Sequence, residues 1–143
     1  MEKEIQNKVE VLLYRLIKSG VRQRCAKKLI IDLGEQPGDL GFIRQGRLEA
    51  AQEAGEVRDE LFDLLVAPER REEAVADEAF CNDYEIYMQC LWAAACRIRE
   101  CESEITETEN PELEKHLRGQ RNQSMKKLEA LKQEIVNHLT SRN

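Results

Sequence analysis

The stretch that decides the fold is residues 80–105, FCNDYEIYMQCLWAAACRIRECESEI. Apolar side chains recur in it at alternating steps of four and three residues, without a break. This is the spacing of a coiled-coil seam, in which one stripe of a helix packs against a neighbouring helix. We therefore predict one continuous helix over residues 69–108. Its seam comprises Phe80, Tyr84, Tyr87, Leu91, Ala94, Ile98, Cys101 and Ile105, and a second line comprises Cys81, Met88, Trp92 and Ala95.

A turn and a second long helix follow this stretch. Asn110-Pro111 predicts a reversal of the chain, because the residue before a proline avoids helical dihedral angles. Leu117, Leu128, Leu131 and Ile135 then mark the apolar face of a helix over residues 112–141. Its weak stretch surrounds Gly119, where we expect a bend or a solvated segment. Residues 68–143 are thus predicted to form a long, coiled-coil-like antiparallel hairpin that turns at 110–111.

The first 66 residues predict three further helices, at about 2–18, 21–33 and 47–66. Ser19-Gly20 separates the first two, since glycine readily adopts the conformation that ends a helix. A Gly/Pro loop over residues 34–46 precedes the third, and within it we expect Phe42 and Ile43 to pin the loop to the core. Ala67-Pro68 ends the third helix. The predicted fold is all-α, a helical bundle of about five helices in a single domain of residues 1–143.

Composition agrees with this fold class and gives the chain an uneven charge. Charged residues make up 35% of the sequence and aromatic residues 5%, against a charged share of about 25% in typical domains. The net charge is −6, but residues 35–110 alone carry −13 and both flanking segments are basic. Either these segments neutralise one another in the folded chain, or the acidic middle faces a partner with a basic surface.

The sequence also bears on the compartment. No apolar run approaches the ~20 residues that a membrane-spanning helix needs, and the charged start Met1-Glu2-Lys3-Glu4 does not resemble a secretory signal. Five cysteines, an odd number, indicate free thiols in a reducing environment. We expect a cytoplasmic protein with no membrane partner.

The usual chemistries of a catalytic or metal site find little support. Cys90 and Cys101 share a helix face but lie roughly 16 Å apart along it, and no Cys-x-x-Cys pair occurs. We expect no cofactor, no metal and no enzymatic activity. One alternative is a Mg²⁺-dependent all-α nucleotide hydrolase that uses Glu53, Glu56, Glu60 and Asp63, although a solvated acidic helix face explains the same residues. Direct nucleic-acid binding is not expected, because the basic cluster at residues 18–28 contains no aromatic residue.

We therefore interpret the chain as a non-enzymatic protein–protein interaction module: an adaptor, small subunit or inhibitor that binds through helical surfaces. A homodimer is one possible assembly. Aromatic and Met side chains anchor interfaces, which makes Tyr84, Tyr87, Met88 and Trp92 the candidate contact residues. An alternative is an acidic inhibitor that imitates nucleic-acid phosphates, as phage-type anti-defence proteins do. Its contact residues would be Glu56, Asp59, Glu60 and Asp63.

Overall fold

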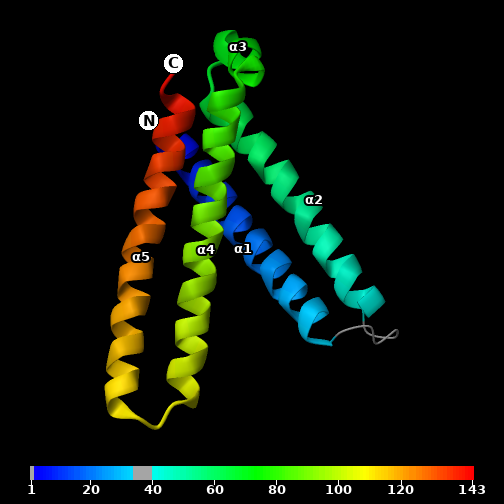
Figure 1. Cartoon of the computed structure of the whole chain (residues 1–143). Coiled ribbons are helices and arrows are strands. Elements are labelled where there is room, and N and C mark those ends of the chain that lie inside the picture. The colour runs from blue at the N-terminus through cyan, green and yellow to red at the C-terminus, as the bar shows by residue number, and fades with distance from the viewer. Residues whose placement is uncertain (1, 34–39) are drawn as a thin grey trace. The chain divides into compact units, whose positions relative to one another are not determined.

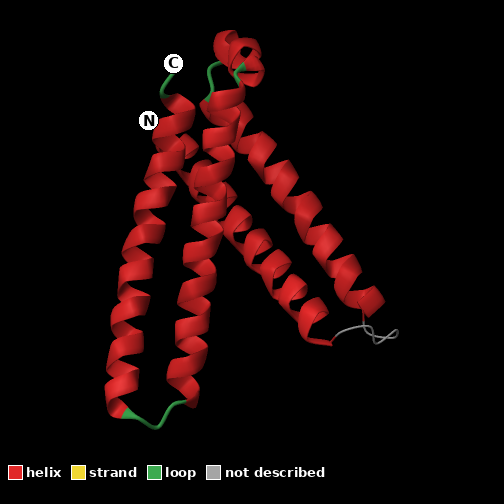
Figure 2. Cartoon of the chain, in the orientation of Figure 1, coloured by secondary structure: helices red, strands yellow, loops and turns green. Residues whose placement is uncertain are grey.

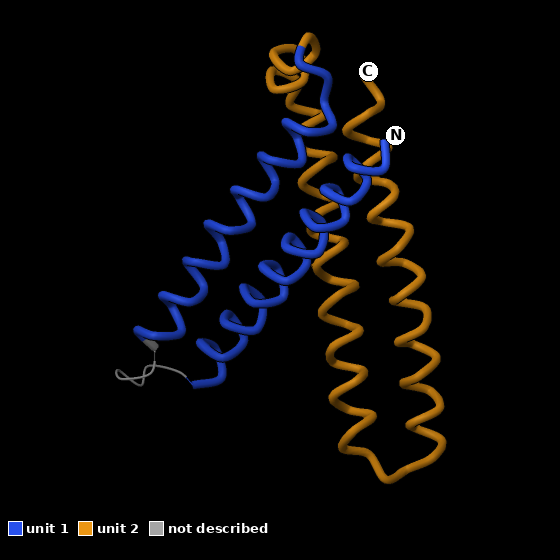
Figure 3. Tube along the Cα trace, turned by 180° about the vertical axis from the view of Figure 1, so that it is seen from behind, with its two compact units in different colours: residues 1–68 blue, residues 69–143 orange. Residues whose placement is uncertain are grey.

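The regular elements of the protein are helices. The computed structural model describes residues 2–33 and 40–143, and within these ranges every regular element is helical (Figures 1 and 2). The predicted all-α fold class is confirmed. The chain forms two compact units, residues 1–68 and 69–143 (Figure 3); the single domain stays a prediction. The elements are α1 (Lys3–Leu33), α2 (Leu40–Leu65), the 3-10 turn η1 (Pro68–Arg70), α3 (Arg71–Ala76), α4 (Glu78–Glu107) and α5 (Pro111–Thr140).

Unit 1 is an antiparallel pair of helices, α1 and α2. Arg15 of α1 contacts Glu53 of α2, whereas Gln23, further along α1, donates to the carbonyl of Ala50, which is earlier in α2. The buried residues are concentrated in one half of each helix, over residues 9–20 and 50–66. No residue of 21–33 or 41–49 is fully buried. The apolar residues of the buried half are Val9, Leu12, Leu13, Leu16, Ala50, Ala54, Val57, Leu61, Leu65 and Val66.

The predicted break at Ser19-Gly20 is wrong, because α1 runs through it as one helix of 31 residues. Both residues are buried. The Ser19 hydroxyl donates to the carbonyl of Leu16 at 2.9 Å, one turn earlier, so its polar group is satisfied inside the helix. Helix propensity is a weak preference that packing overrides. Here the two small residues belong to the buried face of a long helix and do not cap a short one.

The predicted Gly/Pro loop at 34–46 is wrong in its second half. Helix α2 begins at Leu40, so Gly41 and Gly46 are helical. A Cβ added to either would meet nothing within 4 Å, which means that no close approach requires a glycine there. Residues 34–39 of the predicted loop lie outside the described residues. Phe42 does not pin a loop to the core, since its side chain is 86% exposed.

The predicted helix over residues 69–108 is interrupted at Asp77. Pro68–Arg70 form η1, residues 71–76 form α3, and α4 starts only at Glu78. Asp77 has an extended backbone, with φ −86° and ψ 100°, and its carboxylate accepts a hydrogen bond of 3.0 Å from the backbone N–H of Phe80. Aspartate is among the strongest helix N-caps, because it satisfies a backbone donor that the first turn leaves free. The local cap therefore starts a new helix where the wider pattern predicted continuity.

The hairpin of α4 and α5 is confirmed, with its turn at residues 108–110. Asn110 caps α5 by accepting from the backbone N–H groups of Glu112 and Leu113, and Pro111 occupies the first turn. Helix α5 continues through the exposed Gly119 without a break. Several residues of the predicted seams are fully buried, and burial of one Leu side chain contributes about 1.5–3 kcal/mol. The buried residues are Phe80, Tyr84, Met88, Leu91, Ala94, Ala95, Cys101, Leu117, Ile135 and Leu139.

The five cysteines are free thiols, as predicted, and their exposure differs widely. Cys101 is fully buried on the seam of α4, whereas Cys90 is exposed on the same helix. The thiols of Cys25, Cys81 and Cys96 are half-buried. The buried thiol of Cys101 thus takes the place of a small apolar residue in the packing of α4.

Candidate interaction surfaces

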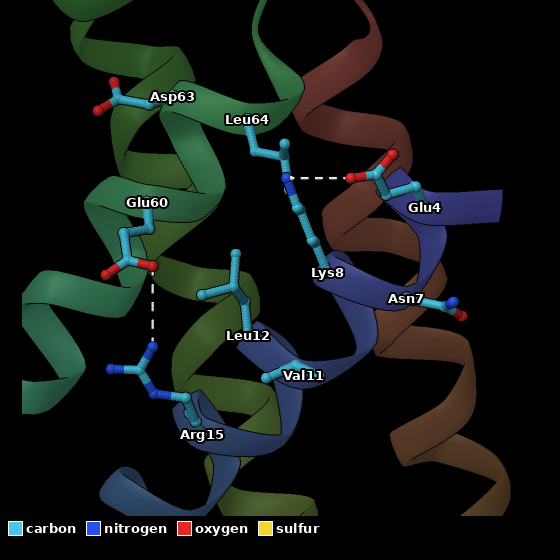
Figure 4. Close-up of a pocket in the computed structure, with 9 residues that line it drawn as sticks. All are labelled: Glu4, Asn7, Lys8, Val11, Leu12, Arg15, Glu60, Asp63 and Leu64. Carbon is cyan, nitrogen blue, oxygen red and sulfur yellow. Dashed lines mark ion pairs between the residues drawn. The ribbon is translucent and has the colours of Figure 1, made fainter. Parts of the chain in front are cut away.

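A groove of about 640 Å³ lies between the first half of α1 and the last turns of α2 (Figure 4). Its apolar part consists of Val11, Leu12 and Leu64. Leu12 is buried, but Val11 is 58% exposed, although it comes from the same turn of α1. The groove therefore presents apolar surface to solvent within unit 1. The polar lining residues are Glu4, Asn7, Lys8, Arg15, Glu60 and Asp63.

Two ion pairs stand on either side of the apolar strip of this groove, as the dashed lines of Figure 4 show. Lys8 pairs with Glu4 at 3.8 Å, and Arg15 pairs with Glu60 at 3.7 Å. Arg15 also binds Glu53 at 2.8 Å, so one guanidinium bridges two turns of α2. A side chain that enters the groove would meet apolar surface between two charged walls, a pattern that suits the apolar anchor of a partner helix.

The flank of unit 1 that carries the groove continues to the opposite end of the hairpin. Leu33 lies 18 residues after Arg15, and Phe42 lies 18 residues before Glu60. Eighteen residues are about five turns of an α-helix, so Leu33 and Phe42 return to the helix faces on which Arg15 and Glu60 meet. Both side chains are exposed. Apolar surface thus lies at both ends of this flank, roughly 27 Å apart.

The end of unit 1 formed by residues 21–33 and 41–48, which we call the basic end, combines positive charge with exposed apolar side chains. It holds six Lys or Arg residues and one Asp, and with Glu35 and Asp39 of the connecting residues the net charge over residues 21–48 is +3. All six basic side chains are exposed. Isolated exposed apolar residues are common on protein surfaces, but five of them occur together at this end of the hairpin. The exposed apolar residues are Leu29, Ile31, Leu33, Phe42 and Leu48.

The four contact residues predicted on α4 fall into two groups. Tyr84 and Met88 are each 3% exposed and serve the core. Tyr87 and Trp92 are half-buried, and the ring of Tyr87 meets His138 of α5 edge-on at 5.5 Å between ring centroids. Much of this wide apolar face of α4 is therefore buried by packing and is not available to a partner. Sequence reasoning missed Phe42 because its position in a predicted loop suggested burial.

The four predicted carboxylates lie together on the outer face of α2. Glu56, Asp59, Glu60 and Asp63 are all exposed. Glu60 pairs with Arg15 and Asp59 pairs with Arg58 at 3.5 Å, so neighbouring cations offset part of this charge. Glu60 and Asp63 also belong to the groove wall. The four carboxylates thus form an exposed acidic face on α2. The ion pairs of Asp59 and Glu60 reduce the negative charge of this face, which makes it a poorer imitation of nucleic-acid phosphates.

Residues 2–33 and 40–143 contain neither a metal-binding group of side chains nor a membrane-spanning helix. In these ranges, no three His, Cys, Asp or Glu side chains come together in a group that could hold a metal ion. Over the same ranges, none of the helices has the length and apolar character needed to span a bilayer.

Comparison with known proteins adds no relative. No protein-family model matches the chain, and no curated protein or solved structure shows significant similarity to it.

Proposed function

We propose that this protein is a non-enzymatic protein–protein interaction module of the cytoplasm, an adaptor, small subunit or inhibitor that binds through its helical surfaces. The observation that carries the proposal is the exposure of Phe42, an aromatic side chain that is 86% accessible at the tip of a helix pair. Exposing a side chain of this size forgoes about 1.5–3 kcal/mol of burial free energy. A partner that covers Phe42 would recover this energy. The free thiols support a reducing compartment.

The chemistry of the surroundings favours a protein partner. The basic end places exposed apolar side chains among six cations, and the same flank offers an apolar groove between ion pairs. Interfaces between proteins combine a few apolar or aromatic anchors with a charged rim that sets specificity and association rate. Single-stranded nucleic acids are bound through aromatic residues along a basic groove. Here one phenylalanine stands among aliphatic side chains, which match an apolar helix face better.

The proposal is tested with the full chain as bait in lysate of the native host, followed by mass spectrometry. Wild type is compared with Phe42→Asp, which replaces the exposed ring by a charge. Met125→Asp is the matched control, because Met125 is also exposed but lies on α5 of unit 2. We expect proteins that bind wild type and the Met125→Asp variant and are reduced at least tenfold on the Phe42→Asp variant. A tenfold loss corresponds to about 1.4 kcal/mol, within the range of a truncated interface anchor.

A set of captured proteins that is the same for all three baits would contradict the proposal. Circular dichroism of the variants checks the fold, since both substitutions alter exposed positions, where effects on stability are usually within about 0.5 kcal/mol.

A further inference from the structure

The chain carries a second surface whose charge is opposite in sign to that of the basic end. Residues 69–86, which we call the acidic end, comprise the end of η1, all of α3 and the first turns of α4. They hold seven Asp or Glu residues and two Arg, a net charge of −5, whereas residues 21–48 at the basic end carry +3. Six of the seven carboxylates are exposed. The seventh belongs to Asp77, which serves as the cap of α4.

Exposed apolar side chains also occur at the acidic end. Val75 of α3 and Ile86 of α4 are 62% and 58% exposed. Ala79, Cys90 and Ala93 lie one or two turns from Ile86 on the same face of α4 and are exposed too. Ile86 is thus the large apolar residue of this face, and the exposed Asn82 and Gln89 lie beside it.

We propose that the basic end of one copy of this chain docks onto the acidic end of a second copy. The inference rests on the proposed function and names the partner of the exposed Phe42 surface as the chain itself. Net charges of opposite sign steer the two ends together. Phe42, Leu33 and Leu29 of one copy then cover Ile86 and Val75 of the other. An anionic membrane is a poorer occupant, because unit 2 carries a net charge of −5 and would be repelled.

Docking of one end onto the other end is a head-to-tail contact. Such a contact uses two different patches, so each bound copy still offers one free patch, and copies add in series or close into a ring. A symmetric dimer would use one patch twice and stop at two copies. Both ends are small, which predicts a weak and reversible association, typical of interfaces below the standard size.

The test is sedimentation velocity on the purified full chain over about a hundredfold range of concentration, which shifts a weak equilibrium by about 2.7 kcal/mol. We expect the average mass to rise above that of one chain as concentration increases. Raising the salt from about 0.1 M to about 1 M shortens the Debye length from about 10 Å to about 3 Å and should return the mass towards one chain.

Two variants separate the two surfaces. Phe42→Asp disables the basic end, and Ile86→Lys disables the acidic end by placing a cation against cations. Each variant alone should remain a single chain, because each lacks one partner surface. Mixed in equal amounts, they should form a complex of two chains that grows no further, since one intact pair of surfaces remains. Met125→Asp should associate as wild type does.

Three results would overturn the inference. These are a wild type that stays a single chain at every concentration, a Phe42→Asp variant that still associates alone, or a mixture that forms no complex. Flotation with vesicles of phosphatidylcholine and phosphatidylserine provides a further arm. If the chain does not self-associate but binds these vesicles through Phe42, the basic end docks onto an anionic membrane and not onto a second copy. If only self-association fails while the lysate bait still captures proteins through Phe42, the proposed function stands and the partner is another protein.

Discussion

The carboxylate of Asp77 and the guanidinium of Arg142, 65 residues apart, form an ion pair that ties the start of α4 to the end of α5. Arg142 also lies over the ring of Phe80, at 4.7 Å from the ring centroid. The ring of His138 stacks on the same Phe80 ring, with 4.2 Å between the two ring centroids. Its Nε2 also donates a hydrogen bond of 2.8 Å to the Phe80 carbonyl. This cluster closes the hairpin of unit 2 at the end opposite its turn.

We expect Asp77→Ala to lower the melting temperature at neutral pH, because it removes both the cap of α4 and the ion pair with Arg142. The hydrogen bond from the Phe80 N–H, together with Arg142, holds the pKa of Asp77 below its ordinary value of 3.8. A lowered pKa stabilises the fold above the ordinary pKa, and this contribution disappears as the pH falls through the folded-state value. Thermal melts of wild type and variant at several pH values measure it. The difference in melting temperature should be full above about pH 5 and shrink below about pH 4.

Leu91→Ala should lower the free energy of unfolding by about 2–5 kcal/mol, the usual cost of removing a large core side chain. Leu91 lies at the centre of the predicted seam and is fully buried. Urea unfolding followed by circular dichroism measures the change. Met125→Ala on exposed α5 surface serves as the control and should stay within about 0.5 kcal/mol of wild type. Equal effects of the two substitutions would contradict the packing of this hairpin.

Gly46→Ala should stabilise the protein by about 0.5–1 kcal/mol, because glycine in a helix interior is worse than alanine by that amount. The added Cβ meets nothing within 4 Å. Chemical denaturation measures the gain, and Gly119→Ala in α5 is a parallel case with equally open surroundings. A loss of stability at position 46 alone would indicate that the chain there is a loop and not the start of α2.

Arg15→Ala should destabilise unit 1 by about 1 kcal/mol at low salt, since partly exposed ion pairs contribute about 0.2–1 kcal/mol each. Arg15 bridges Glu53 and Glu60, and its loss leaves both carboxylates without this cation. Urea unfolding at about 0.1 M and about 1 M salt measures the effect, which should shrink at the higher salt as screening increases. Arg24→Ala, on exposed surface of the same helix, should show less than half of the loss.

The parts of the fold that follow from regular packing could be predicted from the sequence. The rhythm from Phe80 to Ile105 identified α4, and Asn110-Pro111 located the turn, because each signal comes from residues that act together over a long stretch. The predictions failed where a local preference competed with packing. Ser19-Gly20 looked like a helix end, but burial kept α1 continuous. At Asp77 the competition went the other way, and a single capping carboxylate divided a helix that the wider pattern favoured.

The candidate surfaces were harder to predict than the helices. Glu60 and Asp63 were expected on an exposed acidic face and do lie there, but their place in a groove depends on residues about fifty positions earlier. Val11 lies one residue outside the buried stripe of α1. The apolar periodicity of the sequence therefore cannot distinguish this groove residue from an ordinary surface residue. Phe42 was missed because glycines on both sides suggested a loop, whereas the structure places it on an exposed helical turn.

The contrast between the buried Cys101 and the exposed Cys90 equips the molecule with an internal reporter. A thiol reagent added to the native protein should label Cys90 at once, whereas Cys101 has to wait until α4 and α5 separate. With a reagent that reacts faster than the hairpin recloses, the slow labelling rate of Cys101 would give the opening frequency of the hairpin, with no dye or tag attached beforehand.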